Sequence, residues 1–120
     1  MHGLPKHLDL TFFRGQVLVQ ICFGLHDLRL NFDKGGAIHT ERCVHLLVNG
    51  VPDFVECQSM IEAASLLSRL LDERVTEARV AAPKTLELSF SNGDRLRFID
   101  SNEHYESFRI ESYDKSVAVV

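Results

Sequence analysis

An internal repeat constrains the fold of this sequence more than any other feature. When the chain is compared with itself at an offset of 58 positions, five identical pairs and three similar pairs fall in one ungapped register. They are Val17/Val75, Leu28/Leu86, Leu30/Leu88, Phe32/Phe90 and Gly35/Gly93, with Phe13/Leu71, Cys22/Val80 and Ile38/Leu96 as the similar pairs. Two copies are too few for a solenoid. The repeat therefore predicts one domain that contains two related β units, at about residues 13–41 and 71–99.

Each copy carries a hairpin whose loop length follows from the alternation of apolar residues. In the second copy apolar and polar residues alternate from Leu86 to Phe90 and again from Leu96 to Phe98. The two apolar sets share a face only if the loop has an odd number of residues. A three-residue loop, Ser91-Asn92-Gly93, meets this condition and puts glycine third, where a left-handed backbone is needed. Leu88 then lies opposite Leu96.

The first copy has the same features, with the loop Asp33-Lys34-Gly35 and with Leu30 opposite Ile38. Gly35 and Gly93 are thus expected to be structural turn glycines. Each hairpin should have one apolar and one polar face. The polar residues are Arg29, Asn31 and His39 in the first copy and Glu87, Ser89, Arg95 and Arg97 in the second.

Two further elements lie between the copies. Val44–Glu56 is expected to form a hairpin that turns at Asn49-Gly50, with Pro52 placing its second strand at a sheet edge. A helix is predicted at about residues 60–72, opened by a capping box of Ser59 and Glu62. Its apolar stripe is Met60, Ala63, Ala64, Leu67, Leu70 and Leu71, whereas Glu62, Ser65 and Arg69 lie off the stripe.

Three shorter signals complete the expected architecture. Pro83-Lys84 should separate a strand at 75–81 from the one that begins at Leu86. Residues 107–111 and 117–120 are expected to form two final strands, the last of which joins its own sheet or, alternatively, pairs with another chain. We therefore expect one α+β domain over residues 1–120, mainly antiparallel β, as a meander or barrel-like sheet with the helix packed on it.

Composition narrows the classes of partner. The formal net charge is −4, and the 13 Lys and Arg residues are scattered, which argues against nucleic acid. Three cysteines without CxxC spacing favour a reducing compartment over a disulfide scaffold. The first residues lack the features of a signal peptide, and no apolar run approaches the roughly 20 residues of a membrane helix. We expect a cytoplasmic protein that contacts no membrane.

Metal and phosphate sites are not expected. His39, Cys43, His45 and Cys57 are metal-binding residue types, but their spacing matches no structural zinc pattern. Small buried cysteines and surface histidines are the favoured interpretation. Neither Gly35-Gly36 nor Asn92-Gly93 opens a helix as a phosphate loop does. No metal and no cofactor are predicted.

The stretch His104-Tyr105-Glu106-Ser107 has residue types that suit acid–base chemistry. Consecutive strand residues point to opposite faces, so His104 and Glu106 share a face and Tyr105 lies on the other. No glycine-rich nucleophile elbow precedes Ser107. A structural role is favoured, and His104, Tyr105 and Glu106 remain the candidate functional patch.

The order of these features resembles a bacterial domain-of-unknown-function family of small single-domain proteins. The resemblance rests on Val75, on an L-x-L-x-F-x-x-G-x-x-L motif from Leu86 to Leu96, on Tyr105-Glu106 followed by Phe108, and on the apolar end Val117–Val120. The chain departs from the family at Asp114-Lys115-Ser116, where Gly-Gly is common, and at Phe108, where Trp is common. The resemblance implies no activity, substrate or catalytic residue.

The absence of a supported catalytic constellation favours a non-enzymatic binding or interaction protein with a protein partner or a homo-oligomeric state. One form of this prediction, by analogy alone, is an immunity-like antagonist of a basic toxin. Its acidic surface would comprise Glu87, Asp94, Asp100, Glu103 and Glu106. The alternative is a small ligand-binding protein or enzyme that uses His104, Tyr105 and Glu106 in a sheet cavity.

Overall fold

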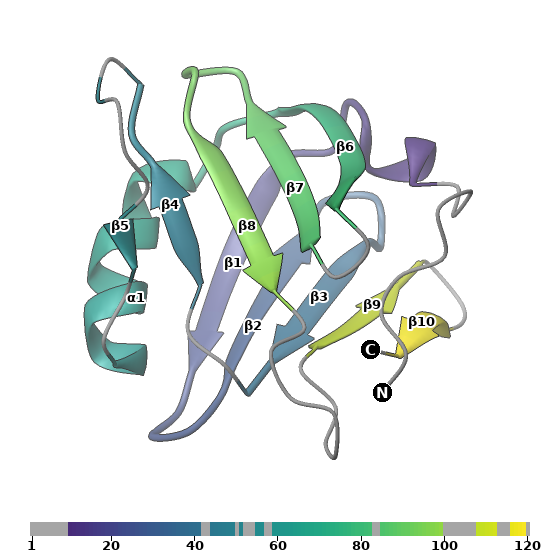
Figure 1. The fold of residues 1–120 in the computed structure, drawn as a ribbon. Coiled ribbons are helices and arrows are strands. Elements are labelled where there is room, and N and C mark those ends of the chain that lie inside the picture. The colour runs from purple at the N-terminus through teal and green to yellow at the C-terminus, as the bar shows by residue number, and fades with distance from the viewer. Residues whose placement is uncertain are drawn as a thin grey trace.

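A computed structural model describes residues 10–41, 44–49, 51, 55–56, 59–82, 85–99, 108–112 and 116–119 (Figure 1). Along the chain the elements are η1 (Thr11–Phe13), β1 (Leu18–Phe23), β2 (Leu28–Phe32), β3 (Ala37–Thr40), β4 (His45–Leu47), β5 (Val55–Glu56), α1 (Met60–Leu67), η2 (Ser68–Leu70), β6 (Val75–Ala82), β7 (Thr85–Phe90), β8 (Arg95–Ile99), β9 (Phe108–Glu111) and β10 (Ser116–Val119). The expected α+β class, mainly antiparallel β with one helix, is confirmed.

The strands form two antiparallel sheets that face each other across one core. Their orders are β1-β2-β3-β9-β10 and β5-β4-β8-β7-β6, and Figure 1 shows the second sheet in front of the first. Two sheets thus replace the single meander or barrel-like sheet that we expected. The hairpin β4–β5 follows β3 in the chain but pairs with β8, whereas β9–β10 follows β8 but pairs with β3. Each sheet therefore combines three strands of one copy with a hairpin that follows the other copy.

The register expected for both repeated hairpins is confirmed. Leu30 pairs with Ile38 and Leu88 pairs with Leu96. In the second hairpin the N–H of Phe90 donates to the carbonyl of Asp94 at 2.9 Å, which closes a three-residue loop. Gly35 and Gly93 have φ angles of 91° and 92°, a region in which glycine is unstrained. The buried leucines of each hairpin consequently point into the shared core.

Hydrogen bonds between the two halves show which residues of the first strands, β1 and β6, are structurally equivalent. Their offset differs by one residue from the 58 positions of the sequence repeat. The N–H of Gly15 donates to the carbonyl of Val75, and the N–H of Asp72 donates to the carbonyl of Leu18, both at 2.8 Å. These bonds relate residues at an offset of 57, whereas β2 and β7 keep the offset of 58. The structural counterpart of Val75 is accordingly Leu18 and not Val17.

Burial supports the offset of 57 positions in the first strand of each half. Phe13 and Leu70, which are related by 57 positions, are both fully buried, whereas Leu71 is 41 % exposed. Cys22 likewise corresponds to Arg79 rather than to Val80. The additional residue of the second half is accommodated at an irregularity between Val80 and Ala82 in β6.

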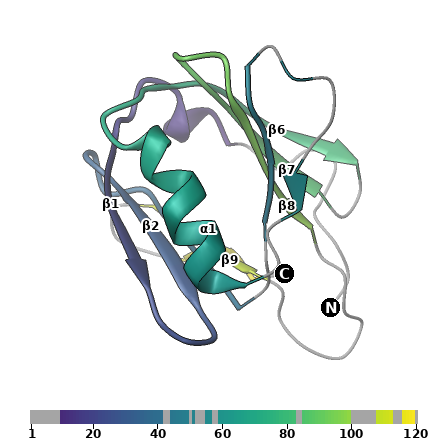
Figure 2. The same ribbon diagram turned by 90° about the vertical axis from the view of Figure 1, so that its left-hand side faces the viewer.

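Helix α1 fills the open side of the sandwich between the two sheets (Figure 2). Ser59 caps it as expected, since its hydroxyl accepts from the N–H of Glu62 at 3.1 Å. Ala63, Leu67 and Leu70 are fully buried against both sheets. The α-helix is shorter than the predicted 60–72, because it ends at Leu67 and continues only as the 3-10 turn η2.

The β4–β5 hairpin turns between Val48 and Val51 as expected, since the N–H of Val51 donates to the carbonyl of Val48 at 3.0 Å, but its strands pair in another register. A two-residue turn at Asn49-Gly50 would pair Leu46 with Asp53, whereas the structure pairs Leu46 with Val55. The edge position of this second strand is confirmed, because β5 is the last strand of its sheet. The final strands β9 and β10 pair with each other, so the tail joins its own domain.

Candidate functional site

Some of the candidate residues named from the sequence lie outside the described part of the chain, and the two candidate histidines that are described lie in different sheets. His104, Tyr105 and Glu106 lie outside the described residues, as do Cys43 and Cys57. His39 is in β3, with its Nε2 3.2 Å from Asp27 Oδ2, and His45 is in β4 of the other sheet. Among the described residues, no group of three or more His, Cys, Asp and Glu side chains is placed to hold a metal ion.

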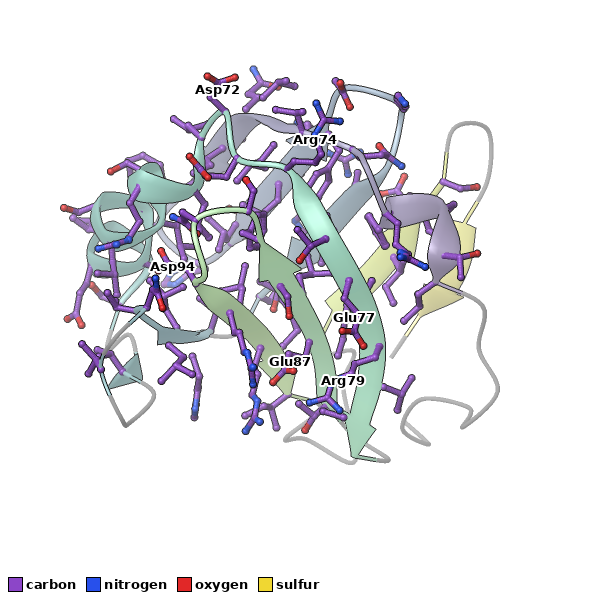
Figure 3. The ribbon with its side chains drawn as sticks, turned by 90° about the horizontal axis from the view of Figure 1, so that it is seen from above. Asp72, Arg74, Glu77, Arg79, Glu87 and Asp94 are labelled. Carbon is purple, nitrogen blue, oxygen red and sulfur yellow. The ribbon has the colours of Figure 1, made fainter. Side chains whose placement is uncertain are left out.

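The prediction of an acidic surface is wrong for Glu87 and Asp94, the two of its five residues that the structure describes, because both are buried. Glu87 is only 1 % exposed although it points away from the core, because arginines from both neighbouring strands cover it. Its Oε2 accepts from Arg79 at 2.8 and 3.0 Å, and its Oε1 accepts from Arg97 at 2.8 Å. Figure 3 shows Arg79 beside Glu87 on this polar face. Glu87 therefore offers no negative charge to a partner.

The ionisation of Glu87 reflects two opposing effects. Burial favours the neutral acid, but the hydrogen bonds and charges of Arg97 and Arg79 outweigh it and lower the pKa of Glu87 below its ordinary value. A carboxylate held ionised between two guanidinium groups is a poor proton acceptor at neutral pH. The cluster thus cross-links β6, β7 and β8 and does not supply a general base.

Asp94 is the second buried carboxylate and has a comparable structural role. It is 0 % exposed and follows the turn between β7 and β8. Its oxygens accept from the backbone N–H of Asn49 at 2.8 Å, from the Nδ2 of Asn92 at 3.0 Å and from the Nε of Arg69. One carboxylate therefore ties together the β4–β5 hairpin, the end of the helix and the β7–β8 turn.

A groove between α1 and the edge strand β5 is the best candidate for a binding site. Its volume is about 630 Å³, and its lining residues are Val55, Ser59, Ile61, Glu62, Ser65, Leu66 and Arg69. The helical residues follow the spacing of a single helix face. Glu62 and Arg69 stand two turns apart, with Ser65 and Leu66 between them. The groove is thus lined by three apolar side chains, Val55, Ile61 and Leu66, and has a charge of opposite sign toward each end.

Arg69 lies at one end of the groove in a fixed orientation. Its Nε is bound to the buried Asp94, which fixes the guanidinium, while 43 % of the side chain remains exposed. An arginine held in this way presents further N–H donors in a fixed orientation. The sequence pattern had set Glu62, Ser65 and Arg69 apart from the buried stripe. It carried no signal that β5 would lie beside them, because the partner of a two-residue strand is not encoded locally.

Exposed large apolar side chains occur on several elements of the structure. The large apolar residues classed as exposed among those described are Val19, Phe23, Leu25, Val51, Val55, Ile61 and Leu71. They belong to β1 and its turn, the β4–β5 hairpin, α1 and the residue after η2.

Comparison with known proteins identifies the family but no activity. None of the described helices is long and apolar enough to cross a membrane. A search of curated proteins found no match, and neither did a search of solved structures. A model described as a family of unknown function (DUF6188) matches residues 10–120. This confirms the expectation of an uncharacterised domain family, and the chain belongs to the DUF6188 family.

Proposed function

We propose that this protein is a non-enzymatic protein-binding domain that holds an extended segment of a partner in the groove between α1 and β5. The observation that carries the proposal is the position of this groove beside an unpaired strand edge. An edge strand exposes backbone N–H and C=O groups, and an added strand can satisfy them. Such a mode of binding needs no catalytic residue.

The groove lining suggests what the partner segment contains. Val55 is 41 % exposed, and Ile61 is 66 % exposed, so an apolar side chain of the partner would cover surface that now faces water. Arg69 favours an acidic group at one end, and Glu62 favours a basic group at the other. The two charges also favour one direction of the bound segment over its reverse.

The buried carboxylates revise the immunity-like form of this idea. A negative docking surface that includes Glu87 and Asp94 is not available, since both are neutralised by arginine. We propose instead that specificity comes from strand addition and from the two groove charges. We also propose that the two halves share an origin, which the matched hydrogen bonds between them support. A cytoplasmic setting is proposed as well, because Cys22 is a free cysteine.

Selection from a phage-displayed library of random peptides tests the proposal. Enriched peptides should share an apolar residue flanked by an acidic residue, and Ser65→Trp, which fills the groove, should abolish their binding. The matched control is Arg95→Trp on the exposed face of β8, which should leave binding unchanged. Failure to enrich any peptide whose binding depends on Ser65 would contradict the proposal.

A further inference from the structure

The outer edge of β1 differs in chemistry from its structural counterpart, β6. Both are terminal strands of their sheets, and they occupy equivalent positions at an offset of 57. The counterparts of Thr76, Glu77 and Arg79 in β6 are Val19, Gln20 and Cys22 in β1. Charged side chains on an edge strand are a common protection against pairing with another chain. The edge of β6 has that protection and the edge of β1 lacks it.

The geometry of β1 also suits pairing. β6 has irregularities between Val75 and Glu77 and again between Val80 and Ala82, and such bulges twist an edge away from a partner. In β1 the register is interrupted only between Leu18 and Gln20, so the strand is regular from Gln20 to Phe23. The outward N–H and C=O groups of Leu18 already bond to Glu73 and Asp72, so the open part of this edge is the regular stretch from Gln20 to Phe23. Its alternate N–H and C=O groups have the spacing that an antiparallel strand requires.

We infer that two copies of this chain associate through antiparallel pairing of β1 with β1. Residues 15–25 contain no charged side chain, so a two-fold axis through this strand brings no like charges together. A two-fold interface places the same patch of each copy against the other, and an apolar patch is complementary to itself. The exposed large apolar residues of β1 and the turn after it are Val19, Phe23 and Leu25, which are 55, 53 and 77 % exposed.

Pairing of this kind extends the contact beyond the strand. It joins the sheets β1-β2-β3-β9-β10 of two copies into one continuous sheet, with the inner faces of both copies on the same side. Helix α1 packs next to β1 on that inner side, as Figure 2 shows. The helices of the two copies therefore approach each other beside the new strand pair. A specific dimer generally buries about 800 Å² from each partner, more than one strand edge provides.

The inference is separate from the proposed function, because no residue of β1 lines the groove beside β5. Dimerisation through β1 leaves the edge of β5 unpaired. Ser65→Trp should therefore block peptide binding without changing the mass in solution. The two proposals can fail independently.

Sedimentation equilibrium tests the dimer. The wild-type chain should have twice the 13.6 kDa mass of one copy. Val19→Lys puts a charge on the edge and should give a single copy, whereas Thr76→Lys at the equivalent position of β6 should leave the dimer intact. A wild-type mass of one copy at every soluble concentration, or a loss of the dimer in both variants alike, would overturn the inference.

Hydrogen exchange of the wild type decides the question should Val19→Lys fail to fold. Outward-facing amides of β1 should exchange more slowly as the protein concentration rises, whereas those of the β6 edge should not change. Exchange at β1 that is independent of concentration would overturn the inference without any variant.

Discussion

Replacement of Glu87 by glutamine perturbs the polar face of the second sheet at one atom. In the wild type both carboxylate oxygens accept from arginine, with two N–H groups of Arg79 on one and the Nε of Arg97 on the other. A glutamine side chain keeps one acceptor and puts an amide NH₂ where the second oxygen was. If the remaining oxygen of the glutamine accepts both bonds from Arg79, its NH₂ group faces the Nε–H of Arg97. Two donors then point at each other.

The cost follows from the burial of the three side chains. A hydrogen bond to a charged group contributes about 1.5–3 kcal/mol, and breaking a fully buried ion pair costs about 3–5 kcal/mol. Arg79 and Arg97 are 48 and 34 % exposed, so a released guanidinium regains water and the upper range does not apply. We expect Glu87→Gln to lower the free energy of unfolding by about 2 kcal/mol at neutral pH.

Urea denaturation across pH provides the assay. Because the pKa of Glu87 is lowered in the folded state, its ionisation stabilises the protein above the unfolded pKa of about 4.3. That stability is lost as pH falls through the lower folded pKa. The difference between wild type and Glu87→Gln should therefore shrink below about pH 4. Glu77→Gln, at an exposed glutamate on the same face, should show little effect. A Glu87→Gln difference that is equal at neutral and acidic pH would refute the reasoning.

Three further substitutions test other contacts. Gly93→Ala should lower the free energy of unfolding by more than the roughly 1 kcal/mol expected for a strained backbone, because the new Cβ would lie 2.5 Å from the Cγ of Asn49. Gly15→Ala is the control for backbone strain alone, because Gly15 has a similar φ and open space around it. Their difference in Tm should narrow once Asn49 is replaced by alanine, which removes the contacts at 2.5 and 2.6 Å but keeps the Asn49 Cβ at 2.9 Å. Asp94→Ala should lower the free energy of unfolding by about 2–3 kcal/mol in urea melts, because the N–H of Asn49 loses its acceptor while the partly exposed Arg69 regains water; a loss below 1 kcal/mol would contradict its cross-linking role. Ser59→Ala should cost about 1 kcal/mol by the same measurement, and no change would contradict the observed cap.

The local structure of each hairpin was predictable because local rules determine it. Alternation from Leu86 to Phe90 and from Leu96 to Phe98 required an odd loop, and glycine in third place supplied it. The same register places Glu87 opposite Arg97, which the structure confirms. That pairing was available from the sequence as a sign that Glu87 would not be a free surface charge. The contact of Glu87 with the second arginine, Arg79, was not predictable, because it depends on the register of β6 against β7, which no tight turn defines.

The pairing of distant strands was not predictable in the same way. An apolar strand such as His45–Leu47 matches any half-buried neighbour, and its placement beside β8 depends on the path of the whole chain. The end of the helix also depended on tertiary structure. Leu70 and Leu71 continue the helical stripe, but the chain turns at Asp72, whose φ is 69°, to bond with Leu18 in the other half. The groove arises from these long-range contacts.

An NMR titration with a selected peptide tests the location of the binding site most directly. Strand addition at β5 predicts that the amide of Glu56, which points away from β4, becomes protected from exchange and that chemical shifts change for Glu62, Ser65 and Arg69 on α1 and η2. Amides of β7 and β8 should keep their shifts. Changes centred on the arginine-covered face around Glu87, with none at β5 and α1, would contradict the account.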